Sequence, residues 1–236
     1  MPGNHAVKFL CWLLAVTLVG CVGEQLAAVP APGISIIGAW KLNPATSDDP
    51  QKVIDKMREE ARQRINRHTT QQQLPMQRPG ARGGMGGPYQ GDTQDSMQQD
   101  TPTPGHPLDP LRNSQMMNVL AAALARGDFL SVRNKAGEVV FDYGSSQRSF
   151  TPGQHSVVSA EGGVGDQTSG WSGRGYVITV RAQMGPDVTE HYAVSADGKH
   201  LIEKLRIGPA ELPAVDLTRV YDPTNETAPR QLPTGD

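Results

Sequence analysis

The amino-acid sequence predicts a mainly β fold: an antiparallel up-and-down meander that forms a barrel or a strongly curled sheet. Three observations predict it. Apolar and polar residues alternate over much of residues 129–221, which is the period of a β-strand. Turn signals rich in Gly, Asp and Pro separate the alternating runs. Further runs at residues 34–42 and 215–221 supply a first and a last strand, so that about eight to ten strands are available for such a sheet.

The first twenty residues predict export. Residues 9–20 form an apolar stretch behind the single cation Lys8, and this stretch is shorter than the roughly 20 residues that a membrane-spanning helix needs. It runs into Leu18-Val19-Gly20-Cys21, which resembles the lipobox of bacterial lipoproteins. The resemblance implies a signal peptide at residues 1–20, a lipid on the thiol of Cys21 and a tether at residues 21–33. Cleavage after Ala28 by an ordinary signal peptidase is the alternative.

Location and partners follow from the next residue and from the charge. Val22 stands where the resemblance to enterobacterial lipoproteins would place an aspartate for inner-membrane retention, so we expect an outer-membrane lipoprotein that faces the periplasm. Removal of residues 1–20 takes away Lys8 and no acid, which changes the net charge from −2 to −3. Such a chain has no basic footprint for nucleic acid. The expected partners are the membrane, through Cys21, and either a hydrophobic small molecule or another envelope protein.

Two helices flank a segment that is expected to be disordered. Asp49-Pro50 and Asp109-Pro110 each combine an N-cap acceptor with a proline at the first helical position, which predicts helices at residues 50–68 and 110–126. Between them, residues 69–107 hold eight Gln, seven Gly and six Pro and almost no large aliphatic side chains. Burial therefore has little to offset the cost of ordering this backbone.

The predicted domain is continuous across that insertion. Residues 34–68 supply the first strand and an amphipathic helix, and residues 108–222 supply the second helix and the meander that completes the same domain. Residues 223–236 are expected to form a disordered tail. Within the meander, Lys135-Ala136-Gly137 joins two alternating runs and predicts a β-hairpin.

Alternation places an indole and a guanidinium on the core side of the first and last strands. Trp40 is the indole, and Arg219 is the guanidinium. A guanidinium on an apolar face needs a partner, and an indole ring is a good one. If the two strands are neighbours, Trp40 and Arg219 are expected to meet as a structural plug. The alternative is a core tryptophan beside an arginine that reaches water.

These residues carry two resemblances. Gly38-Ala39-Trp40 on an opening strand, with Arg219 on a closing strand, resembles the G-x-W and arginine pair with which lipocalins and their calycin relatives plug one end of a barrel. The resemblance implies a lipocalin-like fold, although lipocalins carry no helical insertion after the first strand. A longer pattern is similar to a group of uncharacterised Gram-negative envelope lipoproteins with no assigned activity. It comprises Gly38-Ala39-Trp40-Lys41-Leu42-Asn43-Pro44, Ser47-Asp48-Asp49-Pro50, the Gly-rich insertion, Tyr192, Asp197-Gly198 and Arg219-Val220-Tyr221-Asp222.

The expected function is a non-enzymatic, lipocalin-like domain of a lipid-anchored envelope protein that binds an apolar ligand. The side chains expected to line the ligand site are Ile178, Val180, Leu201 and Leu205. The alternative is a protein-interaction module that assists the assembly of outer-membrane components.

The sequence predicts no catalytic residue, no metal ligand and no cofactor. His191 and His200 are close across the Asp197-Gly198 turn, but Glu190 points away from its neighbour His191 on a strand, so a metal site is not favoured. Gly170-Trp171-Ser172-Gly173-Arg174 begins like a nucleophile elbow but lacks the final glycine. Gly162-Gly163-Val164-Gly165 lacks the following helix of a phosphate-binding loop and is expected to form a loop or bulge.

Overall fold

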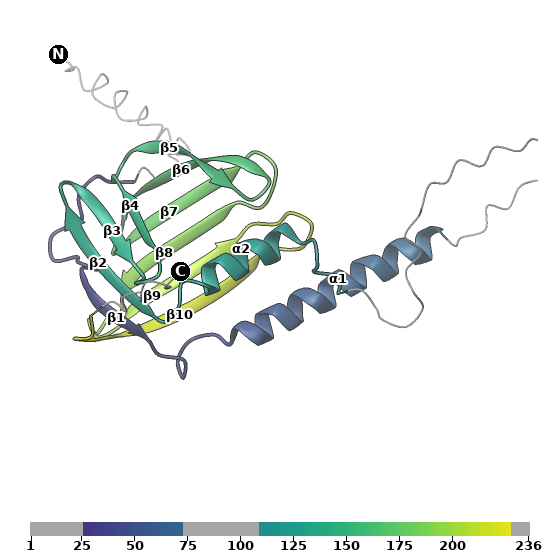
Figure 1. Cartoon of the computed structure of the whole chain (residues 1–236), viewed down its shortest axis with the longest axis horizontal. Coiled ribbons are helices and arrows are strands. Elements are labelled where there is room, and N and C mark those ends of the chain that lie inside the picture. Colours follow the sequence, from purple (N-terminus) through teal and green to yellow (C-terminus); the bar gives the residue numbers. More distant parts are fainter. Residues whose placement is uncertain (1–25, 73–108, 228–236) are drawn as a thin grey trace, which may run out of the picture.

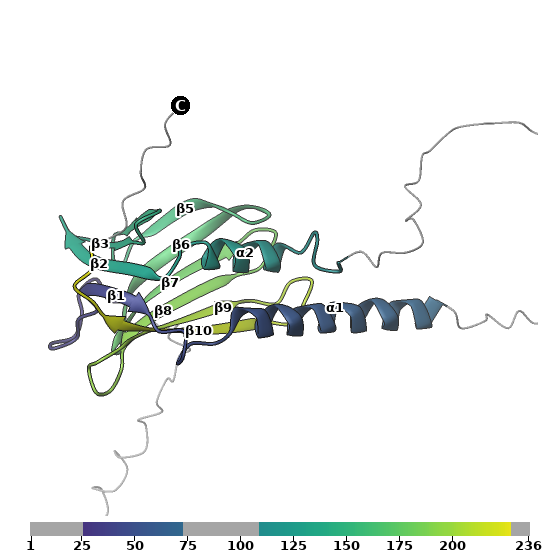
Figure 2. The same ribbon diagram turned by 60° about the horizontal axis from the view of Figure 1, so that its bottom comes forward.

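The computed structural model describes residues 26–72 and 109–227. The predicted signal peptide with Cys21, almost all of the predicted insertion and the end of the predicted tail lie outside the described residues. Figures 1 and 2 show one curled sheet with two helices beside it.

The sheet contains ten antiparallel strands in the order β4-β3-β2-β1-β10-β9-β8-β7-β6-β5. This curled half-barrel confirms the predicted up-and-down meander and is consistent with a lipocalin-like fold. The first and last strands are neighbours, as expected. The strands are β1 (Gly38–Leu42), β2 (Phe129–Lys135), β3 (Glu138–Asp142), β4 (Gln147–Phe150), β5 (His155–Ala160), β6 (Gly163–Ser172), β7 (Gly175–Ala182), β8 (Val188–Val194), β9 (Leu201–Ile207) and β10 (Val215–Pro223).

The predicted hairpin joins β2 to β3. Ala136 and Gly137 occupy its turn with φ angles of 52° and 87°, the two left-handed conformations that match the twist of the flanking strands. Of the loop or bulge expected at residues 162–165, only Gly162 lies in a turn, because β6 begins at Gly163 and pairs with β5 from its first residue. The first strand is also shorter than expected and begins at Gly38.

Helix α1 (Pro50–Gln72) begins where predicted. The carboxylate of Asp49 accepts a hydrogen bond from the backbone N–H of Gln51 at 2.9 Å. Its apolar stripe is buried at Met57 and Ala61, whereas Ile65 is 53% exposed. The difference arises because the helix extends past the end of the sheet, as Figure 1 shows. No helix in residues 26–72 and 109–227 combines the length and the apolar character that crossing a membrane requires.

Helix α2 (Gln115–Leu124) begins five residues later than predicted, so the assignment of Asp109 as its N-cap was wrong. Asp109 instead closes a preceding turn by accepting from the N–H of Leu111 at 3.1 Å. Ser114 is the N-cap, and its Oγ accepts from the N–H of Met117 at 3.0 Å. Glu211, in the loop between β9 and β10, accepts from the N–H of Met116 at 3.0 Å and so holds the helix start from across the fold.

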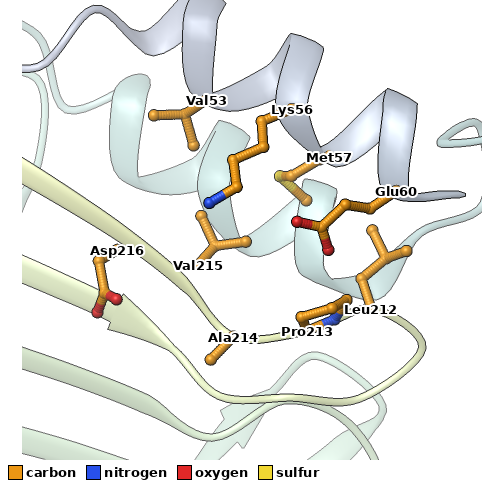
Figure 3. A pocket seen from close by; sticks show the side chains of 9 residues that line it. All are labelled: Val53, Lys56, Met57, Glu60, Leu212, Pro213, Ala214, Val215 and Asp216. Atoms are coloured by element: carbon orange, nitrogen blue, oxygen red, sulfur yellow. The ribbon is translucent and has the colours of Figure 1, made fainter.

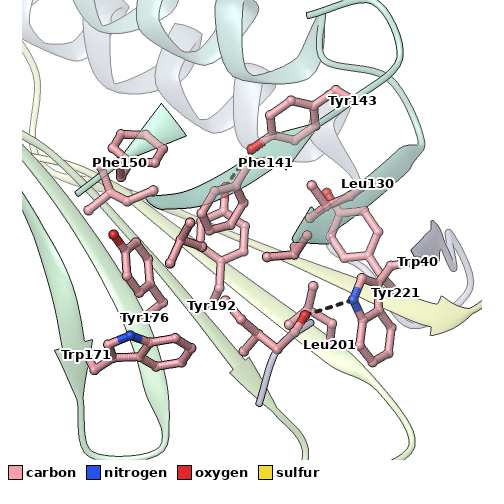
Figure 4. Packing of buried hydrophobic residues seen from close by; sticks show 14 residues of the cluster. Trp40, Leu130, Phe141, Tyr143, Phe150, Trp171, Tyr176, Tyr192, Leu201 and Tyr221 are labelled. Atoms are coloured by element: carbon pink, nitrogen blue, oxygen red, sulfur yellow. Dashed lines mark hydrogen bonds between the residues drawn. The ribbon is translucent and has the colours of Figure 1, made fainter. Parts of the chain in front are cut away.

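Buried apolar side chains form two clusters on the inner face of the sheet. The first, which we call the aromatic cluster and which Figure 4 shows, comprises Ile36, Trp40, Leu130, Val132, Val139, Phe141, Tyr143, Phe150, Trp171, Tyr176, Ile178, Tyr192, Leu201 and Tyr221. The second, the helix cluster, packs α1 and α2 against β9, β10 and the loop between them, and comprises Met57, Ala61, Leu111, Met116, Leu120, Ala123, Leu205, Ile207, Leu212 and Leu217.

Candidate functional site

A network of charged and phenolic side chains lies between the two apolar clusters. Along β9 the inward residues run from Leu201 in the aromatic cluster, through Glu203, to Leu205 in the helix cluster. We call this set the polar network; its members are Arg126, Tyr143, Arg148, Glu190, Tyr192, Glu203, Arg219 and Tyr221.

Strand register brings its central members together. Tyr192 of β8 lies opposite Glu203 of β9, and Glu203 lies opposite Arg219 of β10. All three are buried, because alternate residues of a strand face the same side. Arg148 reaches the network from β4, while Arg126 follows the C-terminal end of α2. The network therefore joins β4, at one end of the strand order, to strands β8 to β10 and to the end of α2.

Glu190 is 2% exposed and makes four hydrogen bonds within the network. Arg148 Nη1 donates to both of its carboxylate oxygens, at 2.9 and 2.7 Å, and Arg126 Nη2 donates at 2.9 Å. The hydroxyl of Tyr192 lies 2.9 Å from Oε2 and shares its single proton between Glu190 and Glu203. Burial acts to raise the pKa of Glu190, but the charges of Arg126 and Arg148 and their hydrogen bonds outweigh it and lower the pKa to about 2.

Glu203 is 1% exposed and is held chiefly by phenols. Tyr221 donates to one oxygen at 2.7 Å, and the hydroxyl of Tyr192, whose single proton is shared with Glu190, lies 3.0 Å from the other. Arg126 Nη1 and Arg219 Nη1 each lie 3.7 Å from Glu203, and neither nitrogen has a hydrogen-bond partner in the described part of the chain. The network thus sets three guanidinium groups against two carboxylates, at distances that make Glu190 the better paired anion.

Four members of the network, three phenols and Glu190, each keep one protonation state through neutral pH. Burial raises the pKa of Tyr143, and it raises the pKa values of Tyr192 and Tyr221 well above their usual value, so all three phenols remain protonated donors. Glu190 remains ionised. An acid or base for proton transfer works best with a pKa near the working pH, and these four groups lie far from it. The geometry supports a structural role, in which the network joins β4 and the end of α2 to strands β8 to β10.

The predicted plug residues are both buried, but the structure does not bring them together. Trp40 lies opposite Pro223, four residues beyond Arg219, which corresponds to about 13 Å along a strand. Trp40 belongs to the aromatic cluster, and its Nε1 donates to the carbonyl of Ile36 at 3.1 Å. Arg219 lies over the ring of Tyr221, with 5.3 Å from Cζ to the ring centroid, and donates to the carbonyl of Gly127. The aromatic ring that Arg219 contacts is thus that of Tyr221 and not, as expected, that of Trp40.

The residues expected to line an apolar ligand site are divided between packed regions. Ile178 and Leu201 belong to the aromatic cluster, and Leu205 belongs to the helix cluster. Val180 is partly buried. The inner face of the sheet is therefore occupied by the protein's own side chains where these residues lie.

The histidines of the meander do not form a metal site among the described residues, which contain no group of three metal-ligating side chains. Nδ1 of His200 lies 2.7 Å from a carboxylate oxygen of Asp222 on β10. His191 lies opposite Lys204 on the other side of the sheet from Glu190.

The outer face of the sheet carries a groove of about 810 Å³, which we call the outer groove. Its floor includes one cross-strand row, in which Thr168 of β6 lies opposite Thr179 of β7, and Thr179 opposite Thr189 of β8. Arg181 and Asp166, a second cross-strand pair, also line it. Leu26 lies at the same groove, so the first described residue of the chain packs on the outer side of the sheet.

A smaller cavity of about 130 Å³, the α1 cleft, lies between α1 and the loop before β10. Figure 3 shows apolar side chains from both elements around it, with charged groups beside them. Its lining includes Val53, Met57, Leu212 and Val215, together with the charged Lys56, Glu60 and Asp216.

Most of the polar network was missed by sequence reasoning, although a signal existed. Glu203 interrupts the inward apolar series Leu201, Leu205 and Ile207, and Glu190 shares its face with Tyr192. Arg219 was correctly predicted to point inward. Three inward charges on consecutive strands were therefore visible in the alternation, and they predict a buried ionic cluster once their strands are known to be neighbours.

Comparison with known proteins adds nothing to these observations: no protein-family model matches the chain, and no curated protein matches it.

Proposed function

We propose that this chain is a lipid-anchored envelope lipoprotein of the outer membrane whose β-domain is a non-enzymatic module that binds a partner protein through its exterior. The observation that carries the proposal is the occupied interior. The two clusters and the polar network fill the inner face of the sheet, whereas two hollows open at the surface of the domain: the α1 cleft, beside the helix cluster, and the outer groove, on the opposite face.

The position of residues 26–28 supports cleavage before Cys21 rather than after Ala28. Ala27 pairs with Trp171 through two backbone hydrogen bonds of 2.8 and 2.9 Å. Leu26 packs over Gly170 so closely that an added Cβ there would lie 2.8 Å from the leucine Cβ. A cut after Ala28 would remove these contacts, so a mature chain that keeps them fits the lipoprotein pathway.

Radiolabelled palmitate tests the anchor. We expect the wild-type protein to incorporate the label and a Cys21→Ser variant to remain unlabelled and unprocessed. A Cys21→Ser chain that matures like the wild type, with no label in either, would refute the lipoprotein assignment.

The α1 cleft favours a protein partner over an apolar small molecule. Its volume of about 130 Å³ is below the roughly 300 to 1,000 Å³ of typical ligand pockets. A cavity of about 150 Å³ holds a benzene-sized group, so the cleft is suited to one apolar side chain. A buried anchor side chain with charged groups around it is a usual feature of a protein interface.

Site-specific photo-crosslinking in cells tests the partner. A crosslinker that replaces Lys56 beside the cleft is expected to capture one reproducible envelope protein. The same crosslinker at Glu59, which is exposed on the same helix but does not line the cleft, is the matched control. Equal capture from both positions would count against the cleft, and a lipid that co-purifies with the protein in native mass spectrometry would favour the apolar-ligand alternative.

A further inference from the structure

The path of the chain before the first strand links the anchor to one face of the domain. The side chains of Ser169 and Trp171 point into the fold, so Gly170 between them lies on the outer face of β6. Leu26 lies on Gly170, and Ala27 pairs with Trp171. The segment is also held from its other side, because an added Cβ at Gly153 would lie 3.6 Å from the Cβ of Ala28.

Few residues separate that fixed point from the predicted lipid. Cys21 precedes Leu26 by five residues. An extended chain spans at most about 3.6 Å per residue, so the acylated thiol lies within about 18 Å of the outer face of β6. Residues 26–28 are part of the fold, so the link to the domain is shorter than the tether expected at residues 21–33.

The outer face near this point has groups suited to a headgroup layer. The threonine row offers hydroxyls within the outer groove, and Arg181 and Asp166, opposite each other, offer a cation and an anion, as zwitterionic headgroups do. Val157 of β5 lies opposite Asp166, which places Val157 on the same face, and it is 73% exposed. Val164, two residues before Asp166 on β6, shares this face and is 42% exposed. Adjacent exposed aliphatic side chains with polar groups around them are found where a surface contacts a membrane or a protein.

We infer that the short link to acylated Cys21 holds the outer groove and the outer face of β5 to β8 against the phospholipid headgroups of the anchoring membrane. This inference rests on the proposed lipid anchor. It adds an orientation: the inner face with α2 points away from the membrane, because α2 lies on the opposite side of the sheet, as Figures 1 and 2 show.

Fluorescence quenching by lipids that carry a spin label on the headgroup tests the orientation. The acylated protein is reconstituted in phosphatidylethanolamine and phosphatidylglycerol vesicles, with one introduced cysteine carrying the fluorophore. The mature chain has no cysteine other than Cys21, so each label is unique. Labels at Gln154→Cys and Arg181→Cys, both exposed at the outer groove, are expected to lose most of their fluorescence. The matched label at Ala122→Cys, exposed on α2, is expected to keep it.

A longer segment between Cys21 and Leu26 tests whether the short link produces the orientation. Twelve Gly and Ser residues inserted after Glu24 are expected to bring quenching at Gln154 and Arg181 down to the level at Ala122. Quenching that persists with the long link, or that is equal at all three positions with the natural link, overturns the inference while palmitate incorporation leaves the anchor intact. A chain that incorporates no palmitate overturns both proposals.

Discussion

Replacement of Glu190 by glutamine is expected to cost about 3 to 5 kcal/mol of unfolding free energy at pH 7, the range for breaking a buried ion pair by removing one partner. The variant keeps the shape of the side chain but leaves Arg126 and Arg148 without their shared anion. The acidity of Glu190 gives a similar figure. At about 1.36 kcal/mol per pH unit, lowering its pKa from 4.5 to about 2 corresponds to about 3 kcal/mol.

The pH dependence gives this prediction a sign. Because the pKa of Glu190 is lower in the folded protein than in the unfolded chain, the stabilisation is complete above pH 4.5 and is lost as the pH falls toward 2. The difference in stability between wild type and Glu190→Gln should therefore shrink on acidification. Urea unfolding followed by tryptophan fluorescence, at pH 7 and at a pH near 2, measures it.

The matched control is Glu226→Gln, which removes the same charge from an exposed pair with Lys41. Exposed pairs contribute about 1 kcal/mol or less, so this variant should be close to wild type at both pH values. If Glu190→Gln costs no more than Glu226→Gln at pH 7, or if its cost is unchanged near pH 2, the reasoning about the network is refuted.

Three further predictions concern the polar network, the packing of Leu26 and Ala27 on β6, and the aromatic cluster. Arg148→Met should lower the unfolding free energy by about 1.5 to 3 kcal/mol and speed amide hydrogen exchange in β4. The control Arg133→Met, at an exposed pair with Asp142, should change the unfolding free energy by less than about 1 kcal/mol. Equal costs would contradict a structural link from β4 to β8. Gly170→Ala should cost about 1 to 3 kcal/mol and expose the Ala27 amide to exchange, while Thr168→Ala on the same face should not; unchanged exchange at Ala27 would contradict the packing of Leu26. Trp40→Ala should lower the unfolding free energy by about 3 to 5 kcal/mol, with a smaller loss for Trp40→Phe, and thermal and urea unfolding measure both.

The fold class could be predicted because its signals are local. Alternation identified the long strands, and Ala136-Gly137 identified the hairpin turn. The start of β6 was not recognised, because Gly163 and Gly165 have low strand propensity. Pairing with β5 on one side and β7 on the other overrides that local preference.

The start of α2 shows why some boundaries are not in the local sequence. Asp109 and Ser114 are both good N-cap residues. Only the fold brings Glu211 to the second of them, where its carboxylate accepts from the N–H of Met116 and from the Oγ of Ser114 at 2.5 Å. A residue almost a hundred positions away therefore helps to select the helix start.

The plug shows the same limit in the sheet. Alternation correctly placed Trp40 and Arg219 on the inner face, and the neighbouring strands were correctly identified. The offset between the strands was not available from alternation, because a shift of two or four residues leaves every side chain on the same face. The structure sets Trp40 opposite Pro223, and Arg219 then pairs with Glu203 and Tyr221.

The polar network connects distant strands across the open half-barrel. The strand order ends at β4 on one side and β5 on the other, so hydrogen bonds between strands do not close the sheet. Arg148 of β4 instead reaches Glu190 of β8, and Arg126 brings the end of α2 to the same carboxylate. The aromatic and helix clusters bury the two carboxylates, and in such a low-dielectric surrounding the attraction within each ion pair is stronger than in water. A ligand that entered between β4 and β8 would have to separate these charges, which is costly, whereas a partner at the α1 cleft or a membrane at the outer groove would leave them in place. The charges in the interior are thus an argument for the proposal that recognition takes place at the surface of the domain.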